Sequence, residues 1–384
     1  MKDPAGEGRD HFTIENGVIR GCSSTEEGGA VFMDGGDFTI KSGTIDANTS
    51  GTQGGALYMG KGVFSISGGA MSNNISGKEG GGIYIVDGTV DINGGNINGN
   101  HATGDGGGIW LGSGNVNMTG GNITKNMANG GDGGGICILG GNFYMTEGTR
   151  ESKSLKENSA TVMDGQGGNG GGVYVSASGS DKHLTVDLLA GDMSGNTSSK
   201  HGGGIYVDMK EGATADITIG NETTGDILNP FLGNNYAGLS GGGLDVEGTG
   251  SDITIWSGTI NGNVSAYVSN TDIRNEGGMV TLAGAADKID VKYKIVKFYA
   301  NNEVDPELTA EQWIVTSTNS LLVPPRSITD TWTKQFHTFS HWNTKRDGTG
   351  VSYTKEGYVY GTTTPAIMNI DTNVALYAQW TTGN

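Results

Sequence analysis

The chain has 384 residues, 72 of them glycine and 6 proline, and its formal net charge is −18. No Gly-X-Y period runs through it, which excludes collagen, and aliphatic residues recur at fixed places between the glycines, which disfavours simple disorder. The excess of Asp and Glu repels a phosphate backbone, so nucleic acid is a poor partner. No apolar run reaches the ~20 residues of a membrane span, so we predict no membrane insertion.

Residues 1–27 are predicted to form a partial coil or cap. They begin without an apolar signal core, and the repeat pattern is already under way at His11–Ile14. We therefore expect the chain to be a fragment of a larger protein. Cys22 and Cys137 are the only cysteines. The alignment below separates them by several coils, or about 20 Å, so they should not form a disulfide.

Internal repetition dominates residues 28–286. Aligned on their glycines, the units are 26, 26, 26 and 27 residues apart at first, and then 37, 32 and 39 residues apart where insertions enter. Each unit holds short alternating segments separated by Gly, Asn and Asp, which tolerate the positive φ of tight corners. A period of two indicates strands. The units begin at Gly28, Gly54, Gly80, Gly106, Gly133, Gly170, Gly202 and Gly241, with a weaker start at Gly277.

Apolar residues fall at equivalent places in successive units, so stacked coils would share one continuous core. The Leu-x-x-Leu-x-Leu pattern of leucine-rich repeats is missing. These features predict an all-β fold, a right-handed single-stranded parallel β-helix over residues 28–286. One inward column comprises Val31, Leu57, Ile83, Ile109, Ile136, Val173, Ile205 and Leu244, and a second comprises Phe38, Phe64, Val90, Val116, Phe143, Leu184 and Ile253.

Asparagines recur with the same spacing, and we interpret them as an architectural ladder at one corner. Amide side chains can hydrogen-bond along such a stack. The series is Asn48, Asn74, Asn100 and Asn126, continued by Asn158, Asn196 and Asn263.

The paired signals GGGI(Y/W) and N-x-(A/S) resemble the repeats of bacterial surface β-helix proteins. These include the chlamydial polymorphic outer-membrane proteins, with their GGA(I/L/V) and F-x-x-N motifs. The resemblance spans about residues 28–268 and implies surface display and adhesion.

Near Asp287 the glycine pattern stops, and residues 287–384 are predicted to form a separate small domain. Its opening segment Val296–Asn301, central segment Phe339–Gly350 and closing segment Leu376–Trp380 resemble the Listeria–Bacteroides repeat. That repeat is a small β-grasp-like module also found in internalin-type surface proteins. The resemblance implies a spacer or accessory binding unit of a secreted Gram-positive protein.

Within this domain, Asp347-Gly348 is predicted to be a hairpin corner. A short helix is expected from Asp305 to Ile314, with proline in its first turn. The sequence departs from the family pattern at His341, where a glycine is usual, and in the long stretch 303–335.

Parallel β-helices also host polysaccharide lyases and glycoside hydrolases. A lyase needs a base, often Arg or Lys, but Arg150 is the only arginine between Gly28 and Val268 and lies in an insertion. An inverting hydrolase needs two carboxyl groups about 6.5–9.5 Å apart, and the acidic residues here fall mostly at corners. We therefore favour a protein that is not an enzyme. The alternative is a carbohydrate-active enzyme whose site is framed by the insertions after Phe143.

Acidic residues precede the glycine run in successive coils. Neighbouring members should lie ~4.8 Å apart, and like charges that close repel each other unless they share a cation. Calcium takes roughly six to eight oxygens, so this column is a candidate calcium site. A solvated acidic edge is the alternative, and no cofactor is required. The candidate ligands are Glu27, Glu79, Asp105 and Asp132, in a column that also holds Gln53, Asn169 and His201.

A second outward column is aromatic. Each ring lies between two inward aliphatic residues, so alternation places it outside, and a row of exposed rings is unusual for a soluble surface. Such a row is suited to sugar rings or to a protein partner. Alternatively the rings pack on one another, at about 0.5–1.5 kcal/mol a pair, partly covered by the insertions. The candidate ligand-binding residues are Phe32, Tyr58, Tyr84, Trp110, Tyr174 and Tyr206. Cys137 occupies the same column between Trp110 and Tyr174.

Together these features predict a monomeric, extracellular adhesin or stalk segment at a cell surface or cell wall. Its rigid surface would bind a glycan or a host or bacterial protein. A carbohydrate-active enzyme and a purely structural spacer are the alternatives.

Overall fold

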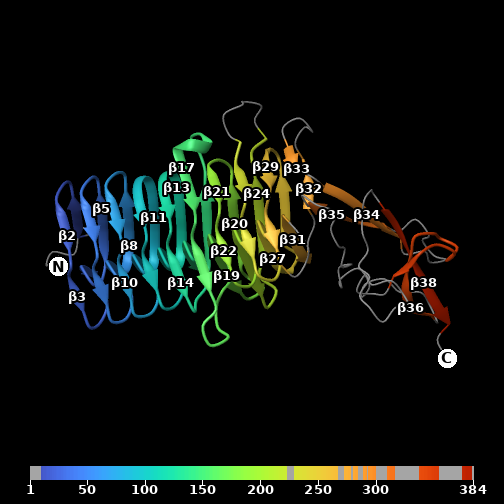
Figure 1. Cartoon of the computed structure of the whole chain (residues 1–384), viewed down its shortest axis with the longest axis horizontal. Coiled ribbons are helices and arrows are strands. Elements are labelled where there is room, and N and C mark those ends of the chain that lie inside the picture. The colour runs from blue at the N-terminus through green and yellow to red at the C-terminus, as the bar shows by residue number, and fades with distance from the viewer. Residues whose placement is uncertain are drawn as a thin grey trace.

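The structure is a computed structural model. It shows a long stack of coils followed by a smaller group of strands toward the C-terminus (Figure 1). Apart from one short 3-10 turn, η1 (Arg150–Ser152), the elements described are all strands. The residues that it describes are 10–222, 229–266, 272–277, 280–283, 289–291, 293–299, 309–315, 337–353 and 374–382.

Each coil passes through four strand positions before the chain reaches the next level, and equivalent strands of neighbouring coils pair in parallel. A parallel connection within one sheet is right-handed in almost all proteins. The partial first coil comprises β1 (His11–Ile14), β2 (Val18–Arg20) and β3 (Ser23–Ser24). The next comprises β4 (Val31–Met33), β5 (Gly36–Ile40), β6 (Thr44–Asp46) and β7 (Thr49–Ser50).

In the most regular coils single strands continue around the corners. These strands are β8 (Leu57–Ile66), with β9 (Ala70–Ser72) and β10 (Ile75–Ser76); β11 (Ile83–Asn98), with β12 (His101–Ala102); and β13 (Ile109–Thr124), with β14 (Met127–Asn129).

Later coils are interrupted by insertions and return to separate strands. Their strands are β15 (Ile136–Leu139), β16 (Gly141–Met145), β17 (Lys153–Lys156), β18 (Ser159–Thr161), β19 (Val173–Ser178), β20 (His183–Leu188), β21 (Asp192–Ser194), β22 (Thr197–Ser198), β23 (Ile205–Lys210), β24 (Thr214–Ile219), β25 (Phe231–Gly233), β26 (Tyr236–Ala237), β27 (Leu244–Thr249), β28 (Asp252–Ile255), β29 (Gly258–Asn261), β30 (Val264–Ser265), β31 (Ile273–Gly277), β32 (Val280–Leu282) and β33 (Ile289–Val291).

The first inward column is confirmed residue by residue. Val31 pairs with Leu57, and the register continues coil by coil to Leu244. Its next member is Ile273, which pairs with Leu244. The weaker coil start predicted at Gly277 is therefore wrong, because the strand of that coil already begins at Ile273.

The second inward column is confirmed except at Leu184, which is displaced from it by two residues. Phe143 pairs with Val186 rather than with Leu184, and Val186 leads through Ile217 to Ile253. Leu184 is still buried and faces inward, because two residues is one full strand period. The spacing of the glycines could not show where the inserted residues leave the strand.

The asparagine ladder is a fully satisfied hydrogen-bond chain. The Nδ2 of Asn100 donates to the carbonyl of Met71 at 3.1 Å and to Oδ1 of Asn126 at 3.0 Å. Its Oδ1 accepts the backbone N–H of Asn74 at 3.0 Å and the Nδ2 of Asn74 at 2.9 Å. Both donors and both acceptor sites of the amide are used. This arrangement explains why a buried asparagine follows an inward apolar residue by three positions in each coil.

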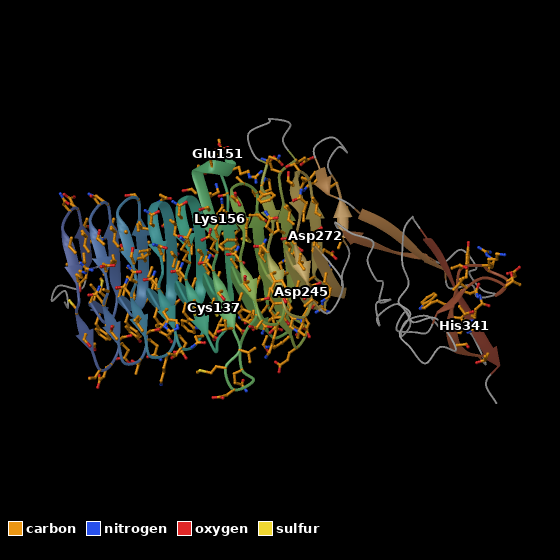
Figure 2. All side chains as sticks on the ribbon, in the orientation of Figure 1. Cys137, Glu151, Lys156, Asp245, Asp272 and His341 are labelled. Atoms are coloured by element: carbon orange, nitrogen blue, oxygen red, sulfur yellow. The ribbon has the colours of Figure 1, made fainter. Side chains whose placement is uncertain are left out.

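The ladder contains one member that the sequence interpretation missed and ends on a carboxylate. Asn235 lies between Asn196 and Asn263 and makes the same contacts. Asp272 accepts the backbone N–H and the Nδ2 of Asn263, at 3.0 and 2.8 Å. Figure 2 shows Asp272 at the last coils of the stack.

The stack of coils begins with the partial first coil and extends past residue 287. Residues 10–24 form the partial first coil, paired with the coil that follows. The expected boundary between residues 286 and 287 lies outside the described residues. However, β33 pairs in parallel with β29, so the stack continues to Val291, beyond that boundary. Cys22 and Cys137 are both free thiols, as expected.

The C-terminal strands form a mixed sheet of their own. Its strands are β34 (Tyr293–Tyr299), β35 (Thr309–Val315), β36 (His337–Asn343), β37 (Ser352–Tyr353) and β38 (Val374–Thr382), in the order β35-β34-β38-β36-β37. The first and last strands are adjacent and parallel, as in a β-grasp sheet. The helix predicted up to Ile314 is wrong for its described part, because residues 309–315 form β35, antiparallel to β34.

The predicted corner at Asp347-Gly348 is confirmed. Gly348 has a φ of 79°, and Oδ1 of Asp347 accepts the backbone N–H of Thr349 at 3.0 Å. Buried Asn343 holds the surrounding loop, since its Nδ2 donates to the carbonyls of Gly348 and Gly350 at 3.0 and 3.1 Å. In the central segment Phe339–Gly350, Asn343, Asp347 and Gly348 therefore shape a loop.

Candidate functional site

The aromatic residues form a vertical column on the outer side of the first strand position. Backbone register places Phe32, Tyr58, Tyr84 and Trp110 one above another. We call these four residues the aromatic stripe. The ring centroids lie 5.1, 5.3 and 4.2 Å apart, and the planes are tilted by only 1°, 11° and 3°. The rings therefore stack face to face along the axis of the coils.

The column continues past Trp110, but it does not stay exposed. Phe32 is 56% exposed, whereas Tyr174 and Tyr206 are 6% and 4% exposed, and Cys137 is fully buried. The expectation that Tyr174 and Tyr206 belong to an outer binding surface is therefore wrong. Alternation gave the correct side of the strand, but it could not show what covers that side.

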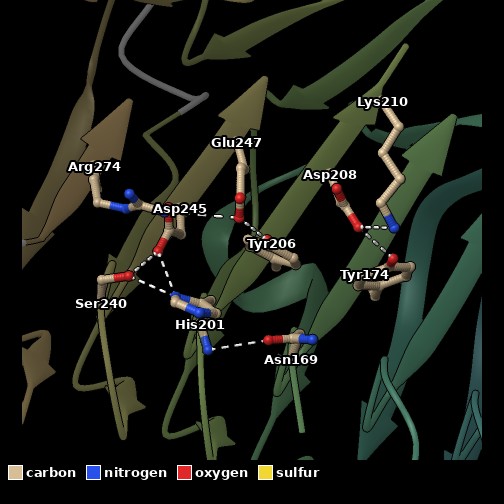
Figure 3. A network of polar contacts seen from close by, with 10 residues as sticks. All are labelled: Asn169, Tyr174, His201, Tyr206, Asp208, Lys210, Ser240, Asp245, Glu247 and Arg274. Atoms are coloured by element: carbon tan, nitrogen blue, oxygen red, sulfur yellow. Dashed lines mark hydrogen bonds and ion pairs between the residues drawn. The ribbon is translucent and has the colours of Figure 1, made fainter. Parts of the chain in front are cut away.

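Two buried tyrosines are held by acidic partners from the next coil. The hydroxyl of Tyr174 donates to Asp208 at 2.8 Å, and Nζ of Lys210 lies 2.7 Å from the same carboxylate oxygen. The hydroxyl of Tyr206 donates to Glu247. Burial, reinforced by these carboxylates, raises the pKa of both phenols. These tyrosines therefore act as neutral donors within a packed network (Figure 3).

Charged residues replace rings in the last coils of the column. Tyr206 pairs with Asp245, which pairs with Arg274. The Asp245 side chain is fully buried and lies 2.7 Å from Nε of Arg274. It also accepts the hydroxyl of Ser240 at 2.5 Å. The sequence interpretation missed these residues. Counting four residues on from Gly241 would have found Asp245, but the start placed at Gly277 hid Arg274.

Ser240, His201 and Asp245 lie together but not in the order that nucleophilic catalysis requires. In a catalytic triad the histidine lies between the nucleophile and the carboxylate. Here one ring nitrogen of His201, Nδ1, meets both partners, since it lies 2.7 Å from Oγ of Ser240 and 3.5 Å from the Asp245 carboxylate, and Ser240 itself donates to that carboxylate at 2.5 Å. The ring of His201 also stacks on Tyr206 with centroids 5.5 Å apart. These contacts hold Ser240, His201, Asp245 and Tyr206 together, which is a structural role.

The acidic residues also form a column, and the carboxylates of Glu79, Asp105 and Asp132 accept hydrogen bonds from within the protein. Oδ1 of Asp105 accepts the backbone N–H of Asp132 at 2.7 Å, and Oδ1 of Asp132 accepts the backbone N–H and Nδ2 of Asn169, both at 2.9 Å. Glu79 accepts Nε2 of Gln53 at 3.1 Å. Burial raises the pKa of Asp105 to about 6 and also raises the pKa of Asp132.

The calcium hypothesis gains no support from this geometry. Among the described residues, no group of three or more His, Cys, Asp or Glu side chains is placed to hold a metal ion. Glu27, Glu79, Asp105 and Asp132 follow one another along the column instead of converging. A calcium site built from corner carbonyls and these carboxylates stays a prediction.

The insertion after Phe143 is organised around cations with internal partners. Lys153 is fully buried, and its Nζ donates to the carbonyls of Thr146, at 2.6 Å, and Glu147. Arg150 lies over the ring of Phe231, 3.9 Å from its centroid. Burial lowers the pKa of Lys153 to about 8, but its amine faces the insertion and not solvent. Neither cation is placed as the free base of a lyase.

One comparison with known proteins gives a match. The family model of the Chlamydia polymorphic membrane protein repeat matches residues 192–208. This stretch runs from β21 through the corner into β23, and it includes the ladder residue Asn196 and the corner glycines that begin at Gly202. The match is short, but it contains both features that recur from coil to coil, the ladder asparagine and the corner glycines. No curated protein and no solved structure gives a significant match.

Within the described part of the chain, no helix is long and apolar enough to cross a membrane.

Proposed function

We propose that this chain is part of an extracellular adhesin or stalk on a bacterial cell surface. The match to a Chlamydia membrane-protein repeat supports a surface role. The coils, tied by backbone ladders and by buried asparagines, supply a stiff rod. The C-terminal sheet, whose sequence resembles the Listeria–Bacteroides repeat, would serve as a spacer or accessory binding unit. We further propose that the chain acts as a monomer and cleaves no polysaccharide.

The observation that carries this proposal is the aromatic stripe on a rigid support. Phe32 is 56% exposed, and Val86 and Leu139 beside the stripe are 41% and 37% exposed. A Cβ on Gly112 would lie 3.1 Å from the ring atoms Cη2 and Cζ3 of Trp110, so this ring extends between Val86 and Leu139. A contiguous apolar surface of this kind marks an interaction site more often than an inert face.

The test is binding by a variant in which Tyr84→Ala and Trp110→Ala are combined. Wild-type protein would be applied to a glycan array and to immobilised extracellular-matrix proteins, with and without calcium. Truncating two central aromatic residues of an interface costs about 2–4 kcal/mol, so we expect binding to fall by about 30-fold or more.

The matched control combines Ile75→Ala and Tyr236→Ala, which remove exposed apolar side chains from the sheet of short strands. Binding that survives the stripe variant but is lost in this control would reject the stripe as the site. New reducing ends or unsaturated products from a polysaccharide panel would favour the carbohydrate-active enzyme instead.

A further inference from the structure

The geometry of the stripe decides what kind of partner it can take. Sugars bind aromatic side chains through an open ring face, but both faces of Tyr58 and Tyr84 are covered by neighbouring rings. Trp110 has Tyr84 on one side and its register partner Cys137 on the other, where it packs against the buried cluster of Cys137, Tyr174 and Tyr206. From Tyr58 to Trp110 the stripe therefore presents ring edges, which are a poor platform for sugar stacking and a good one for apolar side chains.

Two carboxylates, those of Glu27 and Glu79, lie beside these edges, with Gln53 between them in the column. The corner glycine Gly80 has a φ of 66°, and a Cβ there would lie 2.9 Å from the Cβ of Tyr84. This tight corner brings Glu79 next to the ring. The equivalent corner precedes Phe32, because a Cβ on Gly28 would lie 3.2 Å from the Cα of Phe32, and this corner brings Glu27 next to the stripe. Burial, with the charges of Glu79 and Glu27, raises the pKa of Tyr84 to about 12.

The spacing along the two columns matches one type of secondary structure. Successive coils are separated by ~4.8 Å, and successive turns of an α-helix by ~5.4 Å. A helix lying along the stripe would therefore place one apolar side chain on each coil over four coils, with a drift of only about 2 Å. Its neighbouring side chains would meet the carboxylates.

We propose that the aromatic stripe and the adjoining carboxylates of Glu27 and Glu79 bind a basic amphipathic helix of a partner protein. The helix would be about three to four turns long, with apolar residues on the stripe and Lys or Arg along one flank. This inference rests on the proposed function, because it names the partner class for the same surface.

The test uses a synthetic helical peptide of about 14 residues, with leucines on one face and lysines along its flank. A peptide of the same composition in alternating order serves as the comparison, since it has the same charge but no amphipathic helix. We expect the helical peptide to bind at least about tenfold more tightly and to gain helical circular dichroism on binding.

Charge variants test whether the basic flank of the helix lies against Glu27 and Glu79. Glu27 and Glu79 are half-buried, and removing two such charges from the rim of an interface costs about 1 kcal/mol in total, so Glu27→Gln with Glu79→Gln should weaken binding about fivefold at low salt. The matched control, Glu151→Gln with Glu157→Gln, changes net charge equally on exposed residues of the 150–157 segment and should leave binding unchanged.

Three outcomes would overturn this inference. They are equal affinity for the two peptides, equal losses in the two charge variants, and competition by a neutral oligosaccharide. If the helical peptide fails while the Tyr84/Trp110 variant loses binding to a glycan or matrix protein, the adhesin proposal stands and the helix is rejected. If the stripe variant binds every surface as the wild type does, both proposals fail.

Discussion

At the scale of single residues, the buried asparagines show how a repeated polar side chain stabilises an otherwise apolar interior. Each amide bonds to the coil before it and to the coil after it, and Asn100 uses both of its donors and both of its acceptor sites. Leaving a buried polar group unpaired costs about 1–3 kcal/mol. The ladder is therefore intolerant of change at any one member.

Asn100→Asp tests this intolerance. An aspartate can still accept at Oδ1, but it can no longer donate to the carbonyl of Met71 and to Oδ1 of Asn126. These two oxygens would then lie against a buried negative charge. We expect a loss of about 3 kcal/mol or more in the free energy of unfolding, measured by urea denaturation. The control, Asn122→Asp, changes an outward amide of the next coil and should cost below about 0.5 kcal/mol. Equal losses would contradict the account of the ladder.

The carboxyl group of Asp105 should make the stability of the folded protein depend on pH. Its pKa in the folded protein is about 6, above the ordinary value of 3.8, because the carboxyl is desolvated. The folded chain therefore binds more protons than the unfolded chain between these values. The stability contributed by this group is present below about pH 4 and is lost as the pH rises through 6.

Asp105→Asn should remove that loss, because an amide oxygen can still accept the N–H of Asp132. We expect the variant to be more stable than the wild type by about 1–2 kcal/mol at pH 7 and nearly equal to it at pH 4. Thermal melts of both proteins across this range would measure the difference. A difference that stays constant with pH would contradict the assignment.

At the scale of elements, the sequence predicted the strand register correctly where the coils have a constant length. Coils of 26 residues fixed the strand register by counting, so Val31 through Ile109 were placed correctly. The longer coils hid Asn235 and shifted Leu184 from its place by two residues, because glycine spacing does not show which residues leave the strand. The burial of Tyr206 could not be predicted either, because side chains and segments from other coils create it.

Lys153 should be the anchor of the insertion at 146–152. Lys153→Met removes the two hydrogen bonds to the carbonyls of Thr146 and Glu147 while retaining an apolar stem. We expect trypsin cleavage after Arg150 to become about tenfold faster, because local opening costs less free energy. The control, Lys156→Met, breaks only a contact with Asp192 and should leave that rate unchanged. Equal cleavage of all three proteins would remove Lys153 from this role.

At the scale of the whole molecule, function depends on the stacking of coils. The aromatic stripe, its flanking carboxylates and the asparagine ladder exist only because equivalent residues of successive coils are vertical neighbours. A slip of two residues in one coil would move every later member of each column. The proposed binding surface is thus a property of the stack and not of any one repeat.

Engineered disulfides between neighbouring coils measure this register most directly. Asn96 pairs with Asn122 across β11 and β13, and Asn98 pairs with Thr124. In a background with Cys22→Ser, Asn96→Cys with Asn122→Cys should oxidise readily, because paired positions lie within the Cα separation of about 4.4–6.8 Å that a disulfide accepts. Asn96→Cys with Thr124→Cys, two residues out of register, should stay reduced. Mass spectrometry that found the second pair cross-linked as readily as the first would contradict the stacked-coil account.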